Sequence, residues 1–173
     1  MHLIRPFAGL RPAPNYAAEL AAPPYDVLSR EEARARAAGK PWSFLHISRP
    51  EIDLAPGTDP YCDAVYAKAA ENLRRMLIDG VLVRDNSPCF YVYRMIMGDL
   101  TQTGVVVAAS VFAYDKNRIR RHELTQPAKE EDRVRQIDAL NAQTGPVLLT
   151  YPPVLDVDAI LARTVQRTPD CDI

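Results

Sequence analysis

The densest group of side chains that could do chemistry lies between residues 118 and 123. It consists of Arg118, Arg120, Arg121, His122 and Glu123. If this segment is a strand, Arg118, Arg120 and His122 point to one face. Arginine donates through a planar fork and histidine changes charge near neutral pH, so that face suits phosphate or another cluster of anionic oxygens. The alternative is an edge strand whose charges face solvent and prevent aggregation.

The basic character continues beyond this segment. Between Lys116 and Arg135 there are seven Lys and Arg and four Asp and Glu, a local charge of +3 in a chain with a net charge of -1. A net charge near zero argues against a nucleic-acid partner. The local excess favours a small anionic ligand instead.

A second candidate is Asp26, in the sequence Pro23–Val27. Two prolines precede Tyr25 and restrict the backbone, which aims the Asp26 carboxylate. A fixed carboxylate can serve as a general base or as a metal ligand. The alternative is that Asp26 only stabilises the turn before the next helix.

A third candidate is His46, which interrupts the apolar residues Phe44, Leu45 and Ile47. Such a histidine either binds a ligand or is a core residue whose hydrogen bonds are satisfied. Arg49 and Glu51 follow, and an ion pair between them is one interpretation. Arg49 is also a candidate for binding phosphate.

Helix signals occur in five segments: 16–20, 29–39, 59–80, 126–142 and 156–163. Ser29 and Glu32 form a capping box at the start of the second segment. Asp59 is the expected N-cap of the third, and Asp156 that of the last. The third segment carries apolar residues at helical spacing, so it is expected to pack on the core.

Strand signals occur in six segments: 42–48, 81–83, 89–97, 100–114, 118–123 and 147–151. Gly98 and Asp99 form a two-residue hairpin turn between the third and the fourth. Helices between strands, together with one hairpin, predict an α+β fold with a mixed or largely antiparallel sheet. Residues 1–173 are expected to form a single domain or the N-terminal portion of a longer protein.

The composition is typical of a soluble globular protein, with 47% hydrophobic and 25% charged residues. The longest apolar run, residues 104–114, is shorter than the roughly 20 residues that cross a bilayer. No signal peptide is expected, because residues 1–6 show no apolar stretch after a basic region. Cys62, Cys89 and Cys171 form no C-x-x-C pair, so neither a disulfide framework nor a zinc site is expected. We expect a cytoplasmic protein without a membrane partner.

Several of these segments occur together, in the same order, in one known family. They are Arg5-Pro6-Phe7, Gly9-Leu10-Arg11-Pro12, Ala22–Val27, Ser43–His46, Arg121–Glu123, Lys129-Glu130, Asp132-Arg133 and Asn141–Pro146. The chain resembles the N-terminal part of the bacterial domain-of-unknown-function family numbered one thousand and fifteen. That family is grouped with kinases that phosphorylate free serine and with the ParB and sulfiredoxin superfamily.

The resemblance implies a ParB/sulfiredoxin-like fold and an ATP- or ADP-dependent kinase, with Mg²⁺, acting on free serine or a similar small alcohol. Asp26 would accept the hydroxyl proton or hold Mg²⁺. The implied catalytic residues are Asp26, His122 and Glu123, and the implied substrate and phosphate ligands are Arg118, Arg120, Arg121, His46 and Arg49.

Members of the family also carry a downstream Asp-Gly-His-His-Arg element, which resembles the phosphate-binding element of the superfamily. This element is absent from the 173 residues, so the resemblance implies an N-terminal portion whose kinase activity needs the full-length protein. The alternative is a non-catalytic module that binds an anion or a nucleotide, or that supports the structure of a larger protein.

Overall fold

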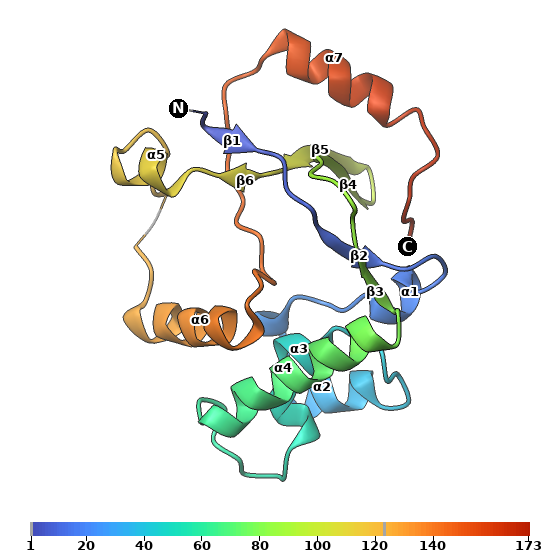
Figure 1. The fold of residues 1–173 in the computed structure, drawn as a ribbon, viewed down its shortest axis with the longest axis vertical. Coiled ribbons are helices and arrows are strands. Elements are labelled where there is room, and N and C mark those ends of the chain that lie inside the picture. The colour runs from blue at the N-terminus through green and yellow to red at the C-terminus, as the bar shows by residue number, and fades with distance from the viewer. Residues whose placement is uncertain (1, 123) are drawn as a thin grey trace. The chain divides into compact units, whose positions relative to one another are not determined.

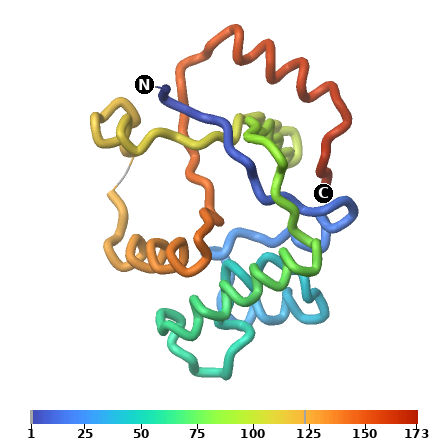
Figure 2. The backbone as a smooth tube through the Cα atoms, viewed as in Figure 1, coloured from blue at the N-terminus to red at the C-terminus, as the bar shows by residue number. Residues whose placement is uncertain are grey.

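The computed structural model describes residues 2–122 and 124–173. The chain folds into two compact units (Figure 1). Unit 1 takes its residues from 1–11, 84–124 and 148–170, and unit 2 from 12–83, 125–147 and 171–173. Figure 2 traces the backbone through both units.

The fold is mixed α+β with small antiparallel sheets, which confirms the predicted class. Three two-stranded sheets form within the described residues: β1 (Ile4–Arg5) with β6 (Ala108–Ala109), β2 (Leu10–Pro12) with β3 (Leu82–Arg84), and β4 (Tyr91–Met97) with β5 (Leu100–Val106). The first and third are antiparallel. Met97 pairs with Leu100 across the turn, where Gly98 has φ of 57°, so the predicted hairpin is confirmed.

Unit 2 is built from short helical elements around one long helix. They are α1 (Ala17–Leu20), the 3₁₀ turn η1 (Tyr25–Val27), α2 (Arg30–Ala37), α3 (Leu45–Ser48), the 3₁₀ turn η2 (Pro50–Asp53), α4 (Asp63–Ile78) and α6 (Pro127–Leu140). Figure 1 shows α2, α3 and α4 side by side. The core of unit 2 lies on α4, where Val65, Ala69, Leu73 and Met76 are buried, and α4 packs against both α3 and α6.

The helix ends in unit 2 follow their sequence signals. Ser29 caps α2, and its hydroxyl and the Glu32 carboxylate exchange bonds with each other's backbone N–H, so the predicted capping box is confirmed. Helix α4 ends in a Schellman motif, because Gly80 has φ of 69° and the Val81 N–H donates to Met76 O at 2.9 Å. Met76 and Val81 are both fully buried. This contact joins the end of α4 to the core.

The strand predicted at residues 42–48 is wrong, because residues 45–48 form the single helical turn α3. The Arg49 N–H donates to Leu45 O at 2.8 Å and the Ser48 N–H to Phe44 O at 2.9 Å. A short apolar run does not distinguish a buried strand from a buried helical turn.

The strands predicted at 100–114 and 118–123 also need correction. Strand β5 ends at Val106, and helix α5 (Val111–Asp115) follows, with the Ser110 hydroxyl accepting from the Ala113 N–H. Asn117 then has φ of 56°, and the N–H groups of Arg118 and Ile119 donate to Ala113 O. These N–H groups therefore cannot pair with a strand, and residues 118–122 contain none. Glu123 lies outside the described residues.

One further strand is missing, and two helices begin at other residues than predicted. Residues 147–151 are exposed and form no strand, since prolines on both sides remove backbone donors. Helix α4 begins at Asp63 and not at Asp59, whose carboxylate instead accepts from the Tyr61 N–H in the preceding turn. Helix α7 (Leu155–Thr164) begins before Asp156. No helix among the described residues has the length and apolar character needed to cross a membrane.

In unit 1, one tyrosine holds the N-terminal segment against β4. The Tyr91 hydroxyl accepts from the Gly9 N–H at 2.7 Å and lies 2.6 Å from the Asp85 carboxylate. Arg11 in turn binds Asp85 through two of its nitrogens. A Cβ at Gly9 would come within 2.9 Å of the Tyr91 hydroxyl oxygen. Position 9 therefore requires glycine for reasons of space.

We predict that Gly9→Ala lowers the free energy of unfolding by about 1–3 kcal/mol, because the added methyl group displaces a tyrosine held by hydrogen bonds. Gly104→Ala is the matched control in the same unit, since nothing lies within 4 Å of its Cβ. Urea unfolding of both variants measures the difference. In a Tyr91→Phe background the cost of Gly9→Ala should shrink. Equal costs for Gly9→Ala and Gly104→Ala would contradict the steric argument.

Candidate functional site

The predicted basic segment is an exposed loop that follows α5 in unit 1. Arg118, Arg120, Arg121 and His122 are all exposed to solvent. The Schellman motif at Asn117 fixes the direction in which the chain leaves the helix. The candidate side chains are thus presented by a local turn and not by a strand face.

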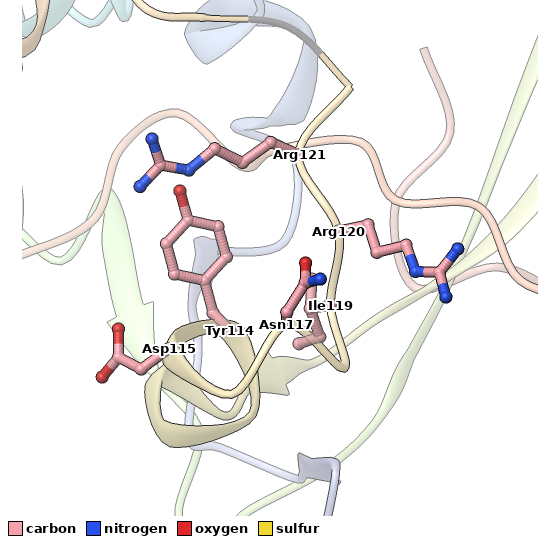
Figure 3. Close-up of a pocket in the computed structure, with 6 residues that line it drawn as sticks. All are labelled: Tyr114, Asp115, Asn117, Ile119, Arg120 and Arg121. Atoms are coloured by element: carbon pink, nitrogen blue, oxygen red, sulfur yellow. The ribbon is translucent and has the colours of Figure 1, made fainter.

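Residues 114–121 surround a hollow of about 490 Å³, which Figure 3 shows in close-up. Its lining is formed by Tyr114, Asp115, Asn117, Ile119, Arg120 and Arg121. The Arg121 guanidinium lies 5.2 Å from the centre of the Tyr114 ring. Figure 3 shows Arg120 pointing away on the opposite side of the segment. Arg121 and the Tyr114 hydroxyl are therefore the donors best placed to bind one anion together.

The arginines of this segment differ in their partners from three arginines of unit 2. Within residues 2–122 and 124–173, no carboxylate pairs with Arg118, Arg120 or Arg121. Acidic side chains neutralise the three arginines of unit 2: Arg49 with Glu51, Arg133 with Asp132, and Arg135 with Asp63. The 118–121 segment therefore carries positive charge that is open to an incoming anion.

Arg49 holds the segment that carries Asp26. One terminal nitrogen of its guanidinium donates to the carbonyls of Tyr25 and Leu28, both at 2.8 Å. Its Nε donates to Glu51 at 2.6 Å, and the Glu51 side chain is only 6% exposed. The expected ion pair is present, and it fixes the backbone on both sides of Asp26. The Asp26 side chain itself is exposed.

Two of the segments that the chain shares with the family it resembles, Ala22–Val27 and Asp132-Arg133, are in contact at Tyr25. The Arg133 guanidinium of α6 lies 4.4 Å from the centre of the Tyr25 ring. Arg133 also pairs with Asp132, which accepts a hydrogen bond from the Tyr66 hydroxyl at 2.8 Å. Burial and this bond raise the pKa of Tyr66 to about 12. These contacts join α6 to α4 and to the turn that carries Asp26.

His46 is a partly buried residue with two hydrogen-bond partners. Its Nδ1 lies 2.8 Å from the Asp53 carboxylate, and its Nε2 lies 3.1 Å from the Lys40 carbonyl. The hydrogen bond to Asp53 raises the pKa of His46. Burial alone would raise the pKa of Asp53, but the hydrogen bonds that its carboxylate makes with His46 and Asn72 outweigh burial and lower that pKa. Both ring nitrogens are engaged, so His46 positions the chain rather than offering a free nitrogen to a ligand.

Sequence reasoning missed two buried amides that bind α3. Asn72 donates to His46 O at 2.7 Å, and Gln136 donates to Ile47 O at 2.8 Å. Their exposed fractions are 1% and 2%. Asn72 lies on the apolar face of α4, between Ala69 and Met76 at helical spacing. A polar amide at such a core position was the signal that could have revealed it.

Some of the predicted site residues are in contact within unit 2, and others belong to unit 1. Asp26, His46 and Arg49 belong to unit 2, where Arg49 and the Asp26 turn are in direct contact. Arg118, Arg120, Arg121 and His122 belong to unit 1. The shared catalytic role of Asp26 and His122 that the resemblance implies stays a prediction. Among the described residues, no group of three His, Cys, Asp or Glu side chains could hold a metal ion.

The family model described as "Protein of unknown function (DUF1015)" matches residues 4–173. The chain belongs to this family. No curated protein and no solved structure matches it. Several residues quoted for the resemblance have structural contacts in this DUF1015 chain: Gly9 and Arg11 at Tyr91 and Asp85, and Tyr25 with Arg133.

We predict that Arg49→Ala destabilises the protein by about 3–5 kcal/mol, since removing one partner leaves the buried Glu51 carboxylate uncompensated. Arg74→Ala is the control, because Arg74 is an exposed arginine on α4. It should change the free energy of unfolding by less than about 0.5 kcal/mol. Chemical denaturation measures both values. A loss below about 1 kcal/mol for Arg49→Ala would show that Arg49 is not a structural anchor.

Proposed function

We propose that the segment Tyr114–His122 binds the phosphate group of a small molecule, and that the protein uses this binding in a nucleotide-dependent phosphoryl transfer to serine or a similar alcohol. The observation that supports it is the Arg121 guanidinium beside Tyr114, with no carboxylate partner among the described residues. An arginine that no carboxylate neutralises can bind phosphate through two parallel N–H groups of its guanidinium. The kinase part of the proposal rests on the resemblance to the free-serine kinases.

In the proposed reaction the protein forms no covalent bond to the substrate and acts by positioning the reactants and stabilising charge. The terminal phosphoryl group of ATP or ADP passes to the serine hydroxyl oxygen: a P–O bond to serine forms, and the P–O bond to the departing ADP or AMP breaks. Asp26 is proposed to accept the hydroxyl proton, and Arg121, His122 and Glu123 to orient the phosphate. Arg118 and Arg120 add positive charge near the same loop.

His46 and Arg49 enter the proposal as positioning residues. Arg49 binds the carbonyls of Tyr25 and Leu28 on both sides of Asp26. His46 and Arg49 both belong to the α3 corner of unit 2. A general base must be held within hydrogen-bond reach of the proton that it accepts, so a rigid turn around Asp26 suits that task.

The second candidate function is a binding module that holds a nucleotide or another anion without turnover. The exposure of Arg118, Arg120 and Arg121 on one loop favours binding as such and is compatible with both proposals. Incubation of the protein with serine and ATP or ADP separates them, with phosphoserine detected by ³¹P NMR. We expect little turnover from residues 1–173 and turnover from a chain that includes the downstream element. Binding without phosphoserine in either chain would favour the module.

We predict that Arg121→Ala weakens the binding of inorganic phosphate by about tenfold to a hundredfold, the loss of one charge-assisted hydrogen bond. Arg120→Ala should weaken it less, because its side chain points away from Tyr114. Arg94→Ala removes an exposed arginine of the same unit and serves as the control. Isothermal titration calorimetry measures the three affinities. Equal losses in Arg121→Ala and Arg94→Ala would exclude a local site.

A further inference from the structure

The His46 cluster (His46, Asp53, Asn72 and the Lys40 carbonyl) joins four parts of unit 2. His46 lies on α3, Asp53 on η2 and Asn72 on α4, and Lys40 precedes α3. The Asn72 amide donates both to His46 O at 2.7 Å and to the Asp53 carboxylate at 2.8 Å. The side chains of His46 and Asp53 are 14% and 20% exposed. The cluster is thus shielded and linked by hydrogen bonds.

The two partners of the imidazole are both acceptors. A carboxylate and a carbonyl oxygen donate nothing, and a neutral imidazole donates through only one of its nitrogens. Only the protonated ring satisfies Asp53 and Lys40 O together. We infer that the His46 cluster is a pH-sensitive contact, in which loss of the ring proton releases one partner and loosens the corner formed by α3 and η2.

Charged groups from each neighbouring element act on this ring. Asp53 of η2 favours the protonated form, and Arg75 of α4 opposes it. Arg34 of α2 and Lys40 line the same hollow of about 370 Å³ beside the ring. Lys68 of α4 acts on Asp53 and helps to keep it ionised. The net effect is a raised pKa for His46, which agrees with the geometry.

The direction of the pH effect follows from this shift. A group whose pKa is raised on folding stabilises the fold fully below its unfolded value, here 6.5. The stabilisation is lost as the pH rises through the pKa of folded His46. Asp53 has a lowered pKa, so its share is lost only as the pH falls below 3.8. The contact is therefore complete in mildly acidic solution and weakens on the alkaline side.

The loosened corner includes the residues that hold the Asp26 turn. Arg49 is the C-cap of α3, and its own N–H donates to Leu45 O. Its guanidinium binds the carbonyls of Tyr25 and Leu28. When His46 loses one of its hydrogen bonds, the loosening should therefore extend through Arg49 to the η1 turn. This inference concerns unit 2 alone and stands whether or not the proposed phosphate site exists.

The test measures the ring and the backbone separately. The chain has three histidines, and NMR of their Cε1 protons gives each pKa in the folded protein. Hydrogen exchange gives protection factors for the amides of Val27, Arg49 and Ile52 between about pH 5.5 and about pH 9. His2→Gln is the control, because His2 is exposed. Asp53→Asn removes the charged partner but keeps a side chain of similar size.

We expect His46 to titrate above 6.5, the ordinary value of histidine, and the three protection factors to fall about tenfold as it does so, the factor that corresponds to about 1.4 kcal/mol. His46→Gln should abolish the fall, and His2→Gln should leave it unchanged. Asp53→Asn should lower the pKa of His46, which tests the inference even if His46→Gln does not fold. A pKa of His46 at or below 6.5, or protection factors that do not change through its titration, would overturn the inference.

Discussion

The carbonyl groups of one short helix set the arrangement of unit 2. Helix α3 has only four residues, Leu45–Ser48, so its carbonyl oxygens find few partners within the helix itself. Leu45 and Ile47 are almost fully buried, and water is not there to replace those partners. Side chains from other helices do so: Asn72 of α4 binds His46 O, and Gln136 of α6 binds Ile47 O. Because buried polar groups without partners are costly, α4 and α6 must present these amides where α3 needs them. The packing of the core follows from that requirement.

The candidate polar residues fall into two groups. His46, Arg49 and Arg133 have partners in several elements of unit 2 and keep its helices and turns together. Arg118, Arg120 and Arg121 lie on an exposed loop, and the described residues offer them no carboxylate. Charged side chains that are already neutralised are poor ligands for an anion, since binding would break an existing contact. The anion-binding proposal therefore rests on Arg121 and its neighbours and gives a positioning role to Arg49 and His46.

The sequence predicted the features that depend on local chemistry and missed those that depend on distant partners. Ser29 with Glu32, and Gly98 with Asp99, act within a few residues, and the capping box and the hairpin were predicted correctly. The segment 42–48 was predicted as a strand because its apolar pattern suits either structure, and the choice was made by Asn72 and Gln136 far along the chain. The basic segment is an exception, because a local feature, the helix end at Asn117, made a loop of the segment that was predicted as a strand. Arg49 was recognised as a possible ion pair, while its bonds to the Asp26 turn needed the structure.

We propose that phosphate binds the loop of unit 1, whereas Arg49 and Arg133 serve the fold of unit 2. Titration of the ¹⁵N-labelled protein with inorganic phosphate, followed by amide chemical shifts, tests this assignment residue by residue. We expect saturable shifts in the segment Tyr114–His122, with the largest near Arg121. We expect no comparable shifts at Arg49 and Arg133, whose guanidinium groups already have acidic partners. Saturable shifts at Arg49 and Arg133, with none in the loop, would contradict the assignment.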